Sequence, residues 1–145
     1  MAKVEIRRAT MDDAAAIHQL NCDEMGYCYA LAKTENCLYS LLNNPGHCIL
    51  VAVINSQVVG YAHANNYDLL YADSFKNMMG IAVSKECKRL GVGKKLLSAM
   101  EDWAKSDGAV GVRLVSGTAR TEAHRFYLSC GYTKNKEQLH FSKMF

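Results

Sequence analysis

The stretch MMGIAVSKECKRLGVGKK, residues 78–95, joins an apolar strand to a turn with two glycines and then to a helix. Residues 78–83 are an apolar run of strand length, and residues 91–106 carry apolar side chains at helical spacing along one side. A glycine turn that opens a helix points free backbone N–H groups, and the positive end of the helix dipole, at a ligand. The stretch therefore predicts an anion-binding site between the strand and the helix.

Basic side chains surround this turn. Residues 85–95 contain one acid, Glu86, and five basic residues: Lys85, Lys88, Arg89, Lys94 and Lys95. Gly91 and Gly93 have no Cβ, so a phosphate can approach the backbone closely. The formal net charge of the whole chain is only +3, whereas a nucleic-acid-binding protein usually has a wide basic face. The turn predicts a small polyanion as ligand and no nucleic-acid partner.

Two common phosphate motifs do not fit the turn. A P-loop requires Gly-x-x-x-x-Gly-Lys-[Ser/Thr], but Lys88 occupies the first glycine position and Lys95 the hydroxyl position. A dinucleotide fingerprint requires a third glycine where Leu96 stands, and the chain does not open with a strand–helix–strand unit. The ligand is therefore expected to be a different phosphate-bearing cofactor.

The rest of the sequence predicts alternating strands and helices. In chain order we expect a strand at 4–8, a helix that starts at Thr10, a helix from about residue 34, strands at 48–54 and 58–64, a loop at 65–74, the strand at 78–83, the helix at 91–106, a strand at 110–116, a helix at 119–130 and a last strand at 138–143. This order is typical of a three-layer α/β/α sandwich with a mixed, mostly antiparallel central sheet. The length of 145 residues fits one domain, 1–145.

Several classes of protein do not fit the composition. No apolar run approaches the ~20 residues of a membrane span, and charged residues interrupt the apolar ones from Lys3 onward, unlike a signal peptide. The six cysteines include no Cys-x-x-Cys pair, so we expect neither a metal site nor a disulfide framework. The expectation is a cytoplasmic protein with reduced thiols and no membrane partner.

The turn and a second motif resemble one enzyme family. The pattern [Arg/Gln]-x-x-Gly-x-[Gly/Ala] fits residues 88–93, and FYLSCGY at 126–132 is similar to an aromatic-Tyr-x-x-x-Gly-[Phe/Tyr] signature further along the chain. Both are features of the Gcn5-related N-acetyltransferase (GNAT) family, which the sequence resembles from end to end. The resemblance implies a GNAT-like fold, acetyl-coenzyme A as the cofactor and a small-amine-type member of the family.

Cofactor contacts follow from the resemblance. The backbone of the strand that ends at Val83 is implied to pair with the pantetheine arm, and the turn to wrap the pyrophosphate. The implied cofactor-binding residues are Ile81, Ala82, Val83, Lys88, Arg89, Leu90, Gly91, Val92, Gly93, Lys94, Arg120 and Tyr127. Lys88 replaces the usual arginine or glutamine, which keeps the charge but loses a bidentate fork. Arg120 stands where the family often has asparagine.

The resemblance also implies a general acid. Tyr127 matches the tyrosine that protonates the coenzyme A sulfur in many members, and a phenol with an ordinary pKa of about 10 suits a thiolate. Spacing alone favours a packed aromatic residue of an amphipathic helix at Tyr127, and it is the resemblance that favours the acid. Many relatives place a glutamate before the glycine turn, but residues 76–81 contain none. The candidate bases that remain are His63, Glu24 and the acids of the 65–74 loop, or no dedicated base at all.

The acceptor site is expected between two segments, residues 23–33 and the loop at 65–74. Their candidate substrate-binding residues are Tyr27, Tyr67, Asp68 and Tyr71. Aromatic rings beside acids suit a small cationic amine through cation–π contacts and charge, although a solvated loop with partly packed tyrosines has the same composition.

The predicted function is transfer of an acetyl group from acetyl-coenzyme A to a primary amine, by direct attack in a ternary complex. The alternatives are a non-catalytic acetyl-coenzyme A sensor or partner domain, and acetylation of a protein N-terminus or an aminoacyl-tRNA. The absent strand glutamate and Lys88 favour the sensor, while a tRNA substrate would require a broader basic surface. The sequence leaves a homodimer open.

Overall fold

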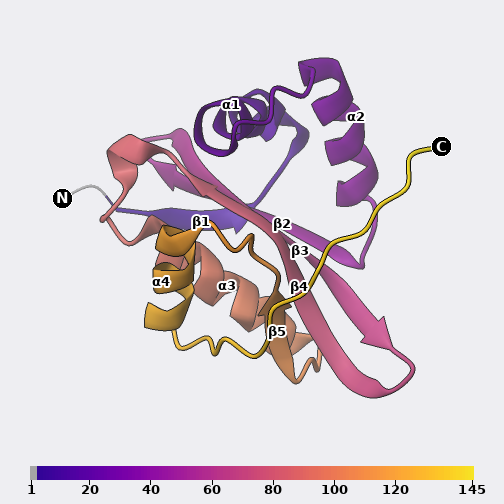
Figure 1. Ribbon diagram of the computed structural model, residues 1–145. Helices are drawn as coiled ribbons and strands as arrows, with labels where there is room; N and C mark the ends of the chain where they lie inside the picture. The colour runs from indigo at the N-terminus through magenta and orange to yellow at the C-terminus, as the bar shows by residue number, and fades with distance from the viewer. Residues whose placement is uncertain (1–2) are drawn as a thin grey trace. The chain divides into compact units, whose positions relative to one another are not determined.

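Five strands form one sheet whose spatial order follows the chain (Figure 1). The computed structural model describes residues 3–145, in one unit that ends at Leu114 and a second unit, Val115–Phe145. The first unit contains β1 (Glu5–Arg8), α1 (Ala14–Met25), α2 (Leu31–Leu42), β2 (His47–Ile54), β3 (Gln57–Leu69), β4 (Ala72–Val83), α3 (Val92–Ser106) and β5 (Gly111–Leu114), with single 3-10 turns at Met11–Asp13 and Lys85–Cys87. The second unit contains α4 (Thr121–Ser129).

The sheet is mixed, as the sequence predicts. β1, β2, β3 and β4 pair antiparallel in succession, while β4 and β5 pair parallel. Parallel neighbours require a crossover connection, and α3 provides it. The apolar run of β2 is buried on both of its sides because helices cover both faces of the sheet.

Neighbouring residues of β3 show the two faces. The hydroxyl of Tyr61 donates a hydrogen bond to Asn21 of α1 at 2.5 Å. The preceding residue, Gly60, faces the other way, where a Cβ would lie 3.2 Å from Val92 and 3.3 Å from Leu96 of α3. Since successive strand residues point to opposite faces, α1 and α2 form one outer layer and α3 the other (Figure 1). The predicted α/β/α sandwich is confirmed.

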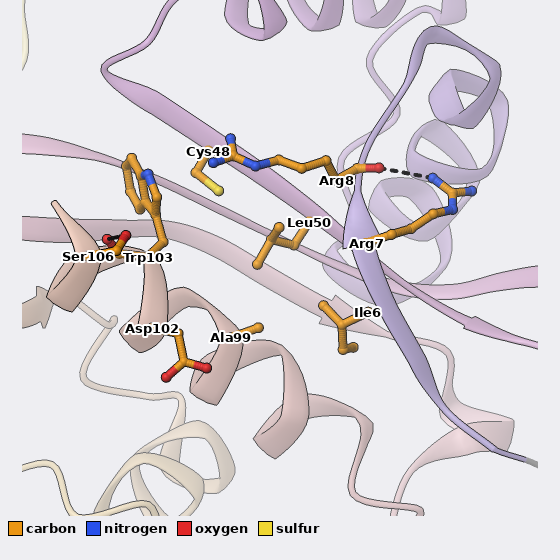
Figure 2. Close-up of a pocket in the computed structure, with 9 residues that line it drawn as sticks. All are labelled: Ile6, Arg7, Arg8, Cys48, Leu50, Ala99, Asp102, Trp103 and Ser106. Carbon is orange, nitrogen blue, oxygen red and sulfur yellow. Dashed lines mark hydrogen bonds between the residues drawn. The ribbon is translucent and has the colours of Figure 1, made fainter.

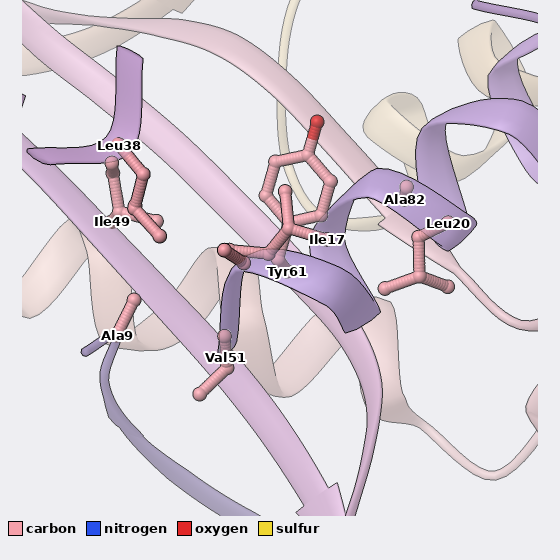
Figure 3. Close-up of a cluster of buried hydrophobic side chains, with 9 residues drawn as sticks. Ala9, Ile17, Leu20, Leu38, Ile49, Val51, Tyr61 and Ala82 are labelled. Atoms are coloured by element: carbon pink, nitrogen blue, oxygen red, sulfur yellow. The ribbon is translucent and has the colours of Figure 1, made fainter. Parts of the chain in front are cut away.

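The core has a part on each side of the sheet. Between the sheet and the first two helices, buried side chains of both layers form one cluster (Figure 3): Ala9, Ala14, Ile17, Leu20, Leu38, Ile49, Val51, Tyr61 and Ala82. On the opposite side, Leu96, Leu97 and Met100 of α3 are almost completely buried. Each such side chain contributes about 1.5–3 kcal/mol to the free energy of folding, so α3 is held firmly on the sheet.

Two predicted elements are wrong. Residues 65–74 are not a loop, because β3 runs on to Leu69 and β4 begins at Ala72, so the two strands form a long hairpin. Its outer part carries polar residues at nearly every position, which removes the alternation that would identify a strand. Residues 138–143 are not a strand, since the second unit contains no strand with which they could pair.

The second unit is organised around the end of α4. The backbone N–H of Tyr132 donates to the carbonyl of Tyr127 at 3.0 Å, and Gly131 between them has φ +91°. This left-handed residue ends the helix and brings the ring of Tyr132 to 5.9 Å from that of Tyr127, whose other aromatic neighbour is Phe126.

Replacement of Gly60 by alanine should destabilise the protein. The added Cβ would also lie 3.0 Å from the carbonyl oxygen of Ala82, and overpacking of this kind costs about 1–3 kcal/mol. Gly80→Ala is a matched control in the neighbouring strand, because its Cβ would meet only the terminal methyl of Met25 at 3.6 Å. Urea denaturation of both variants measures the difference, and equal stability of the two would contradict the proposed close packing of α3.

Candidate cofactor and acceptor sites

The turn before α3 has the backbone geometry of an anion site. Gly91 precedes the helix with φ +78°, a left-handed conformation that favours glycine. The first helical bond runs from the N–H of Lys95 to the carbonyl of Gly91 at 3.0 Å. The N–H groups of Val92, Gly93 and Lys94, which come earlier in the chain, therefore have no hydrogen-bond acceptor within the helix. Apart from Gly91 itself and its two chain neighbours, no atom of residues 3–145 lies within 4 Å of the place of a Cβ on Gly91, so a ligand can approach.

The basic side chains at this turn are available for a ligand. Lys88, Arg89, Lys94 and Lys95 are exposed, and none of them forms an ion pair with any residue in the range 3–145. Arg89 also has a positive φ of +73°, which is uncommon for a residue with a side chain and marks a tight turn. The charge and the free N–H groups together suit a pyrophosphate.

One edge of β4 is open beside this turn. β4 pairs with β5 only from Phe75, opposite Gly111, to Met78, opposite Leu114. Its other edge stays paired with β3 up to Val83. The backbone groups from Met79 to Val83 thus lack a strand partner on the β5 side, so an extended ligand can pair with them as an added strand would. Ile81, Ala82 and Val83 lie on this edge, and their contacts to the cofactor stay a prediction.

Glu24 lies beside the glycine turn. Its carboxylate accepts a hydrogen bond from the backbone N–H of Lys85 at 3.2 Å, which ties the end of α1 to the end of β4. His63, the other candidate base, is held on β3 opposite Gly80 of β4.

His63 is one member of a histidine pair. Its Nε2 lies 2.9 Å from Nδ1 of His47 in β2, so one ring donates and the other accepts, and the rings stack with centroids 5.2 Å apart. Burial, followed by the neighbouring His47, lowers the pKa of His63 to about 4. His63 is therefore neutral at neutral pH and has a lone pair that can accept a proton or a hydrogen bond.

A polar row crosses the sheet next to this pair. Arg113 of β5 donates from Nη1 to Oδ1 of Asn77 in β4 at 2.6 Å, and Asn77 reaches Asn65 of β3 at 3.4 Å. The guanidinium of Arg113 lies 4.1 Å above the ring of Tyr67. His63, Asn65 and Tyr67 are alternate residues of β3 and face the same side of the sheet. Tyr67 thus lies beside a cation in the structure, whereas the predicted acceptor site would place it beside acids.

The other predicted acceptor residues do not come together. Asp68 is exposed near the end of β3, and Tyr71 is 85% exposed in the turn that follows. Tyr27, 62% exposed, follows the end of α1. Residues 65–74 form a hairpin where the sequence predicts a loop, and the role of these residues in binding an acceptor stays a prediction.

Tyr127 and Arg120 belong to the second unit. Burial raises the pKa of Tyr127, and the nearby charge of Arg120 opposes the increase. Arg120 precedes the first residue of α4, and its carbonyl accepts a hydrogen bond from the N–H of His124 at 3.1 Å. The roles assigned to both residues in the sequence stay predictions.

A hollow lies on the α3 side of the sheet, opposite the histidine pair (Figure 2). Arg8, Cys48, Leu50, Asp102 and Trp103 are among the residues that line it. None of the predicted site residues lines it, and we assign it no role. All six cysteines, including Cys48, are free thiols.

Comparison with known proteins identifies the family. Residues 14–132 match the acetyltransferase (GNAT) family. The chain is 30% identical over 146 residues to an aminoalkylphosphonate N-acetyltransferase of Salmonella typhimurium, an alignment that covers 97% of this chain and 90% of that protein. The chain belongs to the GNAT family and is an acetyltransferase. The cofactor of this family is acetyl-coenzyme A, as the sequence predicts.

Solved structures share the fold. An aminoglycoside N-acetyltransferase, AAC(6')-Iy, in complex with coenzyme A has a TM-score of 0.89 at 15% identity, with 99% of this chain and 96% of that one covered. A transcriptional regulator from Bacillus halodurans has a TM-score of 0.88 at 19% identity, with 97% and 100% covered. At these identities the likeness concerns the fold alone.

Sequence reasoning did not find His47, Asn77 or Arg113 as site residues. His47 precedes the apolar run of its strand, and Arg113 is a single arginine in a short strand. Only the strand register brings these residues to one face. Within residues 3–145 no three His, Cys, Asp or Glu side chains are grouped to hold a metal ion, and no helix there is long and apolar enough to cross a membrane.

The pKa of His63 predicts a specific dependence of stability on pH. In the unfolded chain its pKa is about 6.5, so between that value and about 4 the unfolded state binds a proton that the folded state does not. Stability therefore falls as the pH falls through this window. From pH 7 to pH 5 the wild type should lose about 1–2 kcal/mol more than His63→Asn.

Urea denaturation at the two pH values measures this difference. His140→Asn, which changes an exposed histidine, should behave as the wild type does. The same loss in the wild type and in His63→Asn would show that His63 is not held neutral by the fold.

Proposed function

We propose that this protein transfers an acetyl group from acetyl-coenzyme A to a primary amine of a small acceptor, by direct attack in a ternary complex. The observation that carries the proposal is the open edge of β4 from Met79 to Val83, which leads directly into the basic turn before α3. An extended arm can lie on this edge while its phosphates reach the helix N-terminus.

The cofactor contacts divide between backbone and side chains. Backbone groups of Ile81 and Val83 pair with the pantetheine arm. N–H groups of Val92 and Gly93, with the charges of Lys88 and Arg89, bind the pyrophosphate. The thioester then lies near Gly80, where β4 and β5 have just separated.

Attack on the thioester requires a neutral amine. The ammonium first loses a proton to water, and His63, which the fold keeps neutral, accepts a hydrogen bond from the resulting amine or relays its proton. The amine lone pair then forms the C–N bond, the C–S bond breaks, and the thiolate takes a proton from Tyr127. The second proton of the attacking nitrogen returns to the tyrosine through water, so the products are the amide, the thiol of coenzyme A and one released proton. Because both substrates are held side by side, much of the acceleration comes from their orientation.

The acceptor is proposed to be small. The S. typhimurium relative is named for aminoalkylphosphonates, and several solved neighbours are named as aminoglycoside acetyltransferases. Both kinds of acceptor named for these proteins carry an amine, which at neutral pH is an ammonium that must lose a proton before it can attack.

The decisive test is an acetyl-transfer screen with thiol release as the readout. The panel contains aminoalkylphosphonates, aminoglycosides, polyamines, amino acids and peptides. We expect turnover with at least one small amine. Stabilisation by coenzyme A without thiol release from any amine would replace the proposal with a binding domain, and turnover restricted to peptides or aminoacyl-tRNA would replace the small acceptor.

The double variant Lys88→Gln/Arg89→Gln should bind coenzyme A about 10- to 100-fold more weakly, because two charge-assisted contacts to phosphate are lost. Binding of pantetheine, which has no pyrophosphate, should change little. Calorimetric titration measures both. Lys105→Gln, at the far end of α3, is the control. Equal loss for the two ligands would show damage elsewhere in the site.

Tyr127→Phe should lower kcat by about 100-fold or more, the contribution typical of a general acid, with little change in the Kd for coenzyme A. Steady-state kinetics and calorimetry separate the two effects. Tyr39→Phe, which removes a hydroxyl from an exposed ring on α2, is the control. Unchanged turnover in Tyr127→Phe would leave this residue as a packed aromatic only.

A further inference from the structure

Arg113 is fixed in place although no acid neutralises it. Its guanidinium stacks on Tyr67 at 4.1 Å and donates one hydrogen bond to Asn77 at 2.6 Å. A guanidinium has five N–H donors, so most of them remain for another partner. Stacking and the Asn77 bond hold the group in one orientation, which reduces the entropy that a ligand must remove.

Two other cations of the first unit with restricted exposure are paired with acids. Arg7 donates to both carboxylate oxygens of Asp13, at 2.8 and 2.9 Å. Lys76, 5% exposed, reaches Asp107 at 2.6 Å. Arg113 is half-buried too, but no carboxylate in residues 3–114 forms an ion pair with it. Because partly buried charges are usually paired, the position of Arg113 is suited to an external anion.

Arg113 faces the reaction site proposed above. It belongs to the polar row on the His63 side of the sheet. Asn65 follows His63 by two residues in β3, a distance of about 7 Å along the strand. A small molecule whose amine lies at His63 and Gly80 could therefore place a second group near Asn77 and Arg113 with only a short chain between the two.

We propose that Arg113 binds an anionic group of the acceptor, so that the acceptor is a short-chain primary amine that bears a phosphonate, carboxylate or sulfonate. The proposal rests on the function proposed above and names its substrate class. The guanidinium fork can bind two oxygens of such a group at once, while Asn77 and Tyr67 keep the fork in position. Polyamines and aminoglycosides, which are polycations, would be repelled by the same charge.

The test compares amines that share a two-carbon chain. The probes differ in the second group: 2-aminoethylphosphonate, 2-aminoethanesulfonate and 3-aminopropanoate carry an anionic group, ethanolamine carries an uncharged hydroxyl, and 1,2-diaminoethane carries a second amine. In the wild type, kcat/KM should be at least about 10-fold higher for one or more anionic probes than for ethanolamine, as a charge-assisted contact implies. The ranking among the three anions separates a tetrahedral group from a planar carboxylate.

Arg113→Gln should reduce the ratio of kcat/KM for the best anionic probe to that for ethanolamine by about 10- to 100-fold. Arg113→Lys should recover part of the ratio, because it keeps the charge without the fork. Lys105→Gln, exposed on α3, should keep the wild-type ratio. Ethylphosphonate or propanoate, which have no amine, should compete with the acceptor in the wild type, a measurement that requires no variant.

Three outcomes would overturn the proposal. They are a preference of the wild type for ethanolamine or 1,2-diaminoethane, an unchanged ratio in Arg113→Gln at unchanged thermal stability, and an unchanged ratio in Arg113→Gln together with a loss of thermal stability. The last outcome would make Arg113 a structural residue. Failure of the function proposed above would look different, since thiol release would then be absent with every amine, charged or neutral.

Discussion

The close approach of α3 to β3 at Gly60 is the constraint on which the rest of the structure depends. A side chain at this position would collide with Val92, Leu96 and the backbone of β4. Without one, the first turn of α3 rests directly on the sheet, and Val92 is almost completely buried one residue after the left-handed Gly91. The free N–H groups of the helix therefore have a fixed direction relative to the edge of β4, and a site built from backbone groups requires that rigidity.

The separation of β4 from β5 has a second consequence. Pairing between β4 and β5 ends at Met78. The residue that follows, Met79, is a bulge on the other edge of β4: it has no partner in β3, because His63 pairs with Gly80 and Ala64 with Met78. Bulges often turn backbone groups toward a site. The place where β4 loses one neighbour is thus also the place where its backbone is irregular, and His63 lies directly across from it.

The sequence predicts the parts of the structure that depend on local pattern. The buried strand, the glycine turn and α3 follow from apolar periodicity and from the need for a left-handed residue before the helix. The outer hairpin does not follow, because Asn65 and Asn66 have low strand propensity and depend on strand pairing and on side-chain partners in β4, Asn77 and Lys76. The pairing of His47 with His63 joins residues 16 apart, and Arg113 meets Asn77 across 36. Such contacts depend on register, which no local pattern contains.

Register also explains how one small sheet could bind two different anions, the anionic group of the acceptor and the pyrophosphate of the cofactor, at separate positions. Arg113 lies opposite Asn77, and the basic turn begins after Val83, about 20 Å further along β4. This separation exceeds the screening length of about 8 Å at physiological ionic strength, so the two positive regions act independently. In the proposed complex each region attracts its own ligand, and His63, opposite Gly80, lies along β4 between them. An amine anchored by its anion would therefore reach the thioester from one end of β4 while the cofactor enters from the other.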